Sequence, residues 1–155
     1  MLVAPGLQLW LDVFVPSTDK LAEPDVGRSF HWLGDAFADS LSVVLGRSAS
    51  RAISVHRGPA QSTSWSKILC FSGLGAGEVT VAGRKVVGMS ARRDRSGSWI
   101  HAMALLSPRG QDLAELLAGS PDHRAEGRAA LEGTGLADAE HLAGPLAEQV
   151  LARLP

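Results

Sequence analysis

The chain has 155 residues, of which 45% are hydrophobic and 20% charged, which is typical of a folded domain and excludes an intrinsically disordered one. The formal net charge of −1 and the pI near 6.5 argue against nucleic acid and anionic membrane surfaces as partners. One cysteine, no apolar run of about eighteen residues and no secretory signal pattern favour a cytoplasmic protein without a membrane span.

Two periodic segments open the chain. In residues 7–15, "LQLWLDVFV", every second residue is Leu or Val and shares one face, and this alternation predicts a strand. Between residues 30 and 44, apolar side chains recur every three or four positions, which predicts an amphipathic helix. Asp25 or Ser29 is the expected N-cap of this helix, and Gly46 is placed to follow its C-terminus.

The middle of the chain reads as a series of short strands. The dipeptide Ala82-Gly83 lies between two of them and predicts a tight hairpin, and Ser96-Gly97 predicts a second turn, so the section resembles an antiparallel meander. The expected strands are Ile53–His56, Ser66–Phe71, Val79–Val81, Lys85–Ser90 and Trp99–Leu106.

Residues 109–155 are rich in Ala, Leu, Glu and Arg, which predicts a helical part that packs beside the sheet without supplying catalytic groups. One short helix is expected around Leu113–Leu117 and a C-terminal one over Leu142–Leu154. The order of strand, helix, strands and helices predicts a single α+β (mixed α/β) domain over residues 1–155, with an antiparallel-rich sheet flanked by helices.

Lys85 is unusual because it begins an otherwise apolar strand, and lysine is rarely buried without a partner. One interpretation is an exposed cross-strand ion pair with Glu78. The other is a lysine that meets a carboxylate or phosphate oxygen beside the glycine loop Gly73–Val79. That loop precedes a strand, which argues against a dinucleotide fingerprint or a P-loop, and it can equally be a plain flexible turn.

The remaining reactive side chains have structural alternatives. His56 and His101 lie near strand ends, where a lone histidine is usually structural, and no spacing suits a metal site. Cys70 is either a small buried hydrophobe or a nucleophile. The second role requires a base or a positive field, which Lys85 and the nearby arginines can provide.

The segment "GEVTVAGRKVVGMSARR", followed by "WIHAMALL", resembles the signature of the lipoate–protein ligase, octanoyltransferase and biotin–protein ligase superfamily. Its ligase-like bacterial branch carries an acidic residue, a short strand, Gly-Arg-Lys-x-x-Gly-x-x-x-Arg, and later a histidine before a leucine run. The matching positions here are Glu78, Gly83, Arg84, Lys85, Gly88, Arg92 and His101. Upstream segments such as "WSKILCFSGLG" also resemble this branch, so that the resemblance spans residues 3 to about 107.

The resemblance implies the fold of the biotin and lipoate ligase catalytic domain, with Lys85 at the floor of an acyl pocket. Lys85 would reach the activated acyl carbonyl or the phosphate of an acyl-adenylate, and Cys70 would be the second catalytic candidate. Gly88 would let the ligand chain lie against the strand. The implied substrate-binding residues are Gly75, Gly77, Glu78, Gly83, Arg84, Gly88, Ser90, Arg92 and His101.

The implied activity is attachment of a lipoyl or octanoyl group to a lysine of a lipoyl carrier domain, such as a 2-oxoacid dehydrogenase subunit or a glycine cleavage H protein. A ligase would use ATP and Mg²⁺, and a protein-held metal site is not expected. A transferase would pass the acyl group through Cys70 as a thioester and would need no cofactor. The acyl chain length stays open.

In the family, an arginine pair and a glycine-rich loop come before the strand that corresponds to residues 3–15. By that comparison this chain lacks the N-terminal strands and the loop that closes over the acyl group, and we expect weak acyl binding and poor turnover. The alternative function is a non-catalytic acyl-binding or interaction module. An exposed sheet edge would also permit a dimer.

Overall fold

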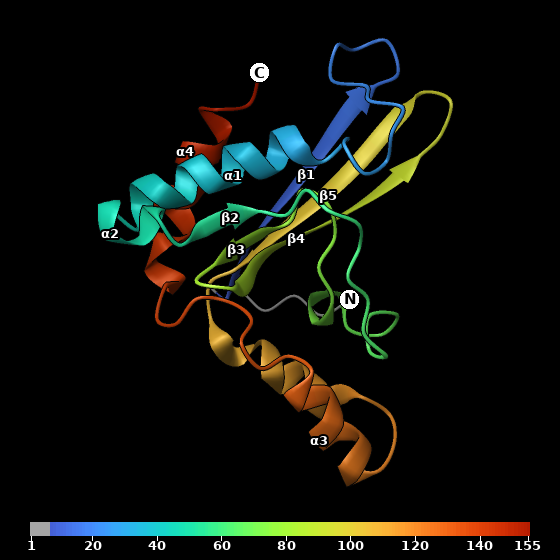
Figure 1. The fold of residues 1–155 in the computed structure, drawn as a ribbon, viewed down its shortest axis with the longest axis vertical. Coiled ribbons are helices and arrows are strands. Elements are labelled where there is room, and N and C mark those ends of the chain that lie inside the picture. The colour runs from blue at the N-terminus through green and yellow to red at the C-terminus, as the bar shows by residue number, and fades with distance from the viewer. Residues whose placement is uncertain (1–6) are drawn as a thin grey trace.

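The computed structural model describes residues 7–155, so the first residues of the family resemblance lie outside the described part. The fold is α+β, with a five-stranded antiparallel sheet flanked by helices, as the sequence predicts (Figure 1). In chain order the elements are β1 (Gln8–Pro16), α1 (His31–Val44), α2 (Arg47–Ser50), β2 (Ile53–Val55), the 3-10 helix η1 (Cys70–Ser72), β3 (Val79–Val81), β4 (Arg84–Arg93), β5 (Gly97–Leu105), the 3-10 helix η2 (Pro108–Leu116), α3 (Pro121–Ala129), the 3-10 helix η3 (Glu140–Leu142) and α4 (Ala143–Leu151).

The strands of the sheet are ordered β1-β5-β4-β3-β2, and every neighbouring pair is antiparallel. The predicted meander is therefore confirmed for β3, β4 and β5. β1 returns to pair along the whole of β5, from Gln8 opposite Leu105 to Pro16 opposite Gly97. This leaves β1 and β2 as the two edge strands.

One face of the sheet carries the main core, which α1 and α4 cover (Figure 1). The predicted apolar stripe of α1 is confirmed, because Leu33, Phe37 and Leu41 are fully buried. Leu146 and Val150 of α4 reach the same core from the C-terminal end of the chain. Side chains three or four positions apart lie on one face of a helix, so each helix buries a single stripe.

The opposite face of the sheet is covered at one end only. A second, smaller core joins Leu69, Phe71, Leu105 and Leu131, beneath the lobe that contains η2 and α3 and projects from the sheet in Figure 1. Farther along this face, the rings of Phe14 and Trp99 pack with their centroids 4.7 Å apart, and the two residues are 38% and 46% exposed.

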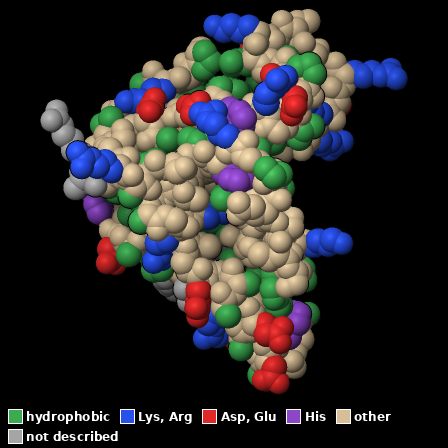
Figure 2. Space-filling model, viewed as in Figure 1, with side chains coloured by type: hydrophobic (Ala, Val, Ile, Leu, Met, Phe, Trp, Pro, Cys, Tyr) green, Lys and Arg blue, Asp and Glu red, His purple; other side chains and the backbone are tan. Residues whose placement is uncertain are grey.

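Figure 2 shows the α1 side of the molecule, where basic and acidic side chains are interspersed, as expected from the small net charge.

The predicted N-cap of α1 is wrong. Neither Asp25 nor Ser29 caps α1, whose N-cap is Phe30 without a side-chain hydrogen bond. Asp25 instead accepts hydrogen bonds from the backbone N–H groups of Gly27 and Arg28, and so orders the turn that precedes the helix. At the other end, Gly46 follows the C-cap with φ 79°, as predicted.

The apolar segment 66–71 is also not a strand. It forms turns and the start of η1, because its backbone hydrogen bonds are local. The N–H groups of Ile68 and Leu69 donate to the Trp65 carbonyl, and the Ser72 N–H donates to the Leu69 carbonyl. Leu69 and Phe71 are buried in the second core.

The C-terminal part is only partly helical. α3 and α4 are regular helices, whereas residues 108–116 form a 3-10 helix in place of the expected α-helix, and α4 ends at Leu151. Within residues 7–155, no helix is long and apolar enough to cross a membrane.

Candidate functional site

The β3–β4 hairpin positions the unusual lysine. Ala82 and Gly83 both adopt left-handed backbone angles, with φ of 51° and 77°, which is the geometry of a tight two-residue turn. Thr80 pairs with Lys85, but Val79 pairs with Val87, so the intervening residue is an extra one. Such an insertion is a β-bulge, and it interrupts the alternation of side chains along β4.

The bulge changes which side chains share a face. Val86 and Val87 are consecutive, yet both are fully buried in the main core. Lys85 and Gly88, three positions apart, consequently lie together, and a methyl group placed on Gly88 would be 3.4 Å from Lys85 Cε. The bulge therefore directs the lysine toward the second core and the loop before β3.

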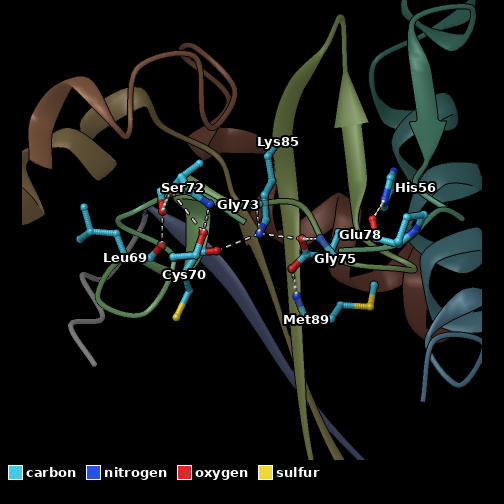
Figure 3. A network of polar contacts seen from close by, with 12 residues as sticks. His56, Leu69, Cys70, Ser72, Gly73, Gly75, Glu78, Lys85 and Met89 are labelled. Carbon is cyan, nitrogen blue, oxygen red and sulfur yellow. Dashed lines mark hydrogen bonds and ion pairs between the residues drawn. The ribbon is translucent and has the colours of Figure 1, made fainter. Parts of the chain in front are cut away.

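Lys85 is buried, with only 7% of its side chain exposed, and all three N–H groups of its ammonium have partners. Nζ donates to the carbonyl oxygens of Cys70 at 2.9 Å and Gly73 at 2.8 Å, and lies 2.6 Å from Glu78 Oε2 (Figure 3). The Phe71 ring centroid is 5.0 Å from Nζ, within the range of a cation–π contact.

Glu78 is equally buried and saturated. Its Oε2 accepts from the Gly75 N–H at 2.6 Å as well as from Lys85, and its Oε1 accepts from the Met89 N–H at 3.0 Å. β3 has no residue paired with Met89, so no strand carbonyl accepts the hydrogen bond of the Met89 N–H. The Glu78 carboxylate accepts it instead. Glu78 thus joins the glycine loop to the edge of β4.

This geometry excludes the exposed ion pair that was one interpretation of the sequence. Burial lowers the pKa of Lys85 below its usual value, and the charge and hydrogen bond of Glu78 oppose that shift. The pair is therefore a buried charged network, and the polar partners of the lysine are supplied within the chain.

Cys70 is exposed, so its interpretation as a small buried hydrophobe is wrong. It begins η1, and its carbonyl oxygen, not its sulfur, enters the Lys85 network (Figure 3). Cys70 is not in a disulfide, and it lines a pocket of about 150 Å³ together with Ser62, Gly75, Glu78 and Lys85. The pocket therefore has a cysteine and the buried lysine among its lining residues, and Figure 3 shows the Cys70 sulfur turned away from Lys85.

The glycine loop makes close contacts that a plain turn does not need. Gly77 has φ 81°, its N–H donates to the His56 carbonyl at 2.7 Å, and the Glu78 carbonyl accepts from the His56 N–H at 2.8 Å. A methyl group on Gly77 would lie 2.4 Å from Phe30 Cβ. Backbone of the loop therefore packs directly on the start of α1. His56 Nε2 lies 2.9 Å from the Pro59 carbonyl, which agrees with a structural histidine.

The other predicted site residues divide into two groups. Gly83 lies in the hairpin turn, and Arg84 donates to the carbonyls of Thr134 and Gly135, which holds the C-terminal part against the hairpin. Ser90 and Arg92 lie farther along β4, beyond the pocket.

His101 is the cross-strand neighbour of Ser90, and its Nδ1 lies 2.5 Å from Asp12 Oδ1. It also lies outside the 150 Å³ pocket. The structure therefore brings Lys85, Glu78, Gly75, Cys70 and Gly88 together, and leaves the others elsewhere.

Three residues of the site were not predicted from the sequence. Phe71 packs its ring on Gly88, where a methyl group would lie 3.0 Å from Cε2, and Gly73 supplies a carbonyl to Lys85. Met89 contributes its N–H to Glu78. Only the glycine-rich spacing around Gly73 was a visible signal, because backbone and ring contacts leave no pattern in a single sequence.

In the described part of the chain, no group of three His, Cys, Asp or Glu side chains is placed to hold a metal ion.

Comparison with known proteins gives limited information. No family model matches the sequence, and no curated protein matches it significantly. One solved structure with a related arrangement is that of a protein from T. acidophilum, described as a putative lipoate protein ligase with bound lipoic acid. The two are 13% identical with a TM-score of 0.42, over 92% of this chain and 60% of that one, so this chain spans about three fifths of that protein's length. Similarity at this level does not assign a site or a reaction.

Proposed function

We propose that the protein transfers a lipoyl or octanoyl group to a lysine of a lipoyl carrier domain. The observation that carries this proposal is a pocket whose lining residues include both the buried Lys85 and the exposed Cys70. A fixed cation stabilises the negative charge that develops on an acyl oxygen during attack. The signature residues around Lys85 support the same class of reaction.

The thioester route fits these residues better than the ATP-dependent route. Cys70 Sγ attacks the carbonyl carbon of an acyl thioester, an S–C bond forms, and the donor thiol leaves with a proton. The carrier lysine then attacks the acyl-Cys70 thioester, an amide bond forms, and the Cys70 thiol is restored. Lys85 polarises the carbonyl oxygen in both steps.

ATP with Mg²⁺ would serve a ligase, and Glu78 is the carboxylate that contacts Lys85 and is therefore the residue to test as a metal contact. Both Glu78 oxygens already accept hydrogen bonds, from Gly75, Lys85 and Met89. Mg²⁺ needs carboxylate oxygens that are open to it, so Glu78 fits this role poorly.

An acyl oxygen has to replace an existing partner of Lys85. We expect it to displace the Cys70 or Gly73 carbonyl, because the Glu78 contact carries the opposite charge. The full occupancy of the ammonium also favours the second candidate function, a non-catalytic acyl-binding module. A further copy of the chain would pair along the edge strand β1, whose outer side has no partner strand in the described sheet.

The test incubates the protein with an octanoyl thioester donor and a lipoyl carrier domain, and measures both masses by intact-protein mass spectrometry. We expect one octanoyl group on the carrier and, without the carrier, one on Cys70. Cys70→Ser should abolish transfer with an unchanged melting temperature, whereas Ser42→Ala on α1 serves as the control. Transfer by Cys70→Ser only with lipoate, ATP and Mg²⁺ would establish ligase chemistry instead.

Binding separates the two candidate functions. If no transfer occurs, octanoate and lipoate are titrated into the protein by calorimetry. Release of binding heat, together with weaker binding to the Lys85→Arg variant, would support the binding module. Absence of both transfer and binding would overturn the proposal.

A further inference from the structure

Three polar side chains form one row across the face of the sheet opposite α1 and α4. Asp12 on β1 pairs with His101 on β5, and His101 pairs on its other side with Ser90 on β4. Ile100 and Ala102, which flank His101, are buried in the main core, so the alternation of β5 directs the row to the opposite face. An acid, an imidazole and a hydroxyl thus follow one another over three adjacent strands.

Asp12 holds the imidazole in one orientation. Its Oδ1 lies 2.5 Å from His101 Nδ1 and also accepts the indole N–H of Trp10 at 2.8 Å. When Nδ1 carries the proton that Asp12 accepts, Nε2 of the neutral ring is a free base. The two side chains are 38% and 49% exposed, so both water and a small substrate can reach them.

Ser90 is placed to be the partner of that base. It lies on the opposite side of His101 from Asp12, is exposed, and its hydroxyl makes no hydrogen bond with any described residue. Nε2 of His101 is likewise without a partner among residues 7–155. Directly opposed residues on neighbouring strands have Cβ atoms about 4.5–5.5 Å apart, so a change of rotamer is enough to join the two groups.

The backbone beside Ser90 offers a donor for a developing oxyanion. The Met89 N–H points away from β5, toward Glu78, so the Ala91 N–H two residues later points to the same side. β3 does not extend that far, so no strand pairs with Ala91 on that side. A free N–H on the residue after a serine nucleophile is a recurring oxyanion donor. The Arg92 side chain, opposite Trp99, adds positive charge close by.

We infer that Ser90, His101 and Asp12 form a second acyl-transfer site, which takes small activated acyl groups such as aryl esters and thioesters. Ser90 Oγ attacks the acyl carbon and gives its proton to His101 Nε2, and an acyl–Ser90 ester forms. The bond to the leaving group breaks, and His101 passes the proton to that group. Water then attacks the ester with the same proton transfers, which releases a carboxylic acid and restores Ser90.

This site does not depend on the reaction proposed at Lys85. Gly88 lies between Lys85 and Ser90 on β4, and its cross-strand neighbour Met103 belongs to the second core. None of the three residues of the row lines the pocket beside Cys70. The two sites can therefore be tested separately.

A fluorophosphonate probe tests the inference directly, because an activated serine displaces its fluoride far faster than an ordinary hydroxyl does. The full chain is treated with the probe, its intact mass is measured, and the adduct is located by peptide mapping. We expect one adduct, on Ser90. His101→Gln should slow labelling at least about 100-fold, the range of general-base catalysis, and Asp12→Asn should slow it less.

Matched variants make the outcome decisive. Ser98→Ala changes a serine of β5 and Ser42→Ala changes one of α1, and both variants should label as the unmodified protein does. Melting curves show whether each variant is folded. If His101→Gln does not fold, the labelling rate of Asp12→Asn, which keeps the shape of the side chain, replaces it as the test. Two results would overturn the inference. One is that a control serine hydrolase is labelled under the same conditions while Ser90 is not. The other is that folded Asp12→Asn and His101→Gln are labelled as fast as the unmodified protein.

Discussion

Lys85 and Glu78 form an ion pair in which Nζ and Oε2 are 2.6 Å apart and each side chain is only 7% exposed. The chain offers a comparison at the same distance, because Arg57 and Asp35 are also 2.6 Å apart but remain about half exposed. Burial, not distance, therefore distinguishes the two pairs, and it decides what each contributes to stability.

Breaking the buried pair should be costly. Lys85→Met or Glu78→Gln leaves an uncompensated buried charge, and we expect each to lower the free energy of unfolding by about 3–5 kcal/mol. Arg57→Gln should cost less than about 1 kcal/mol. Urea unfolding measures all three, and the double variant Lys85→Met/Glu78→Gln should cost less than the sum. Equal costs for the buried and exposed pairs would contradict this account.

Gly34 is required where α1 passes the glycine loop. A methyl group at this position would lie 2.2 Å from the Gly77 carbonyl oxygen, so Gly34→Ala should destabilise the protein by at least about 1–3 kcal/mol. Gly144 of α4 has open space around it, and Gly144→Ala should instead add roughly 0.5–1 kcal/mol through helix propensity. Thermal melting of the two variants should therefore shift in opposite directions.

Gly88 and Phe71 should be energetically coupled. The ring lies 3.0 Å from where a Gly88 methyl would be, so we expect Gly88→Ala to cost about 1–3 kcal/mol. The double variant with Phe71→Leu should cost less than the two single changes added together, because the smaller side chain vacates that space. A double-mutant cycle from denaturant unfolding measures the coupling, and strict additivity would show that the contact is loose.

The hairpin turn contains a strained residue. Ala82 has φ 51°, a conformation that costs a non-glycine residue about 1–2 kcal/mol, whereas Asn tolerates it and favours this turn when glycine follows. Ala82→Asn should raise the melting temperature by a few degrees. Gly83→Ala, at φ 77°, should lower it. A fall in both would mean that the turn has another geometry in solution.

Asp12 should make the stability depend on acid pH. Its hydrogen bond from His101 holds the pKa of the Asp12 carboxyl below its ordinary value of 3.8. The folded state therefore binds the proton less readily than the unfolded state, so this contribution is present above pH 3.8 and is lost as the pH falls through the folded-state pKa. Asp12→Asn or His101→Gln should flatten the acid limb of melting temperature against pH, and an unchanged limb in both would disprove the pairing.

The amino-acid sequence by itself determined the elements that rest on local pattern. The alternation of residues 7–15, the three- and four-residue spacing in α1 and the Ala82-Gly83 dipeptide each predicted the element found, because side-chain period and turn conformation are properties of neighbouring residues. The Ser66–Phe71 segment shows the limit. A short apolar run has no period that separates a strand from a turn packed on a core, so that prediction was wrong.

Only the tertiary structure decided the chemistry of the two candidate sites. The bulge at Val86 and the fold of residues 69–75 over Lys85 convert a conceivable surface ion pair into a buried one. Asp12 and His101 are 89 residues apart and meet only because β1 returns to pair with β5 in one register. A shift of one residue in that register would turn Asp12 into the core, and register is set by burial of one whole face of the sheet, which no local segment encodes.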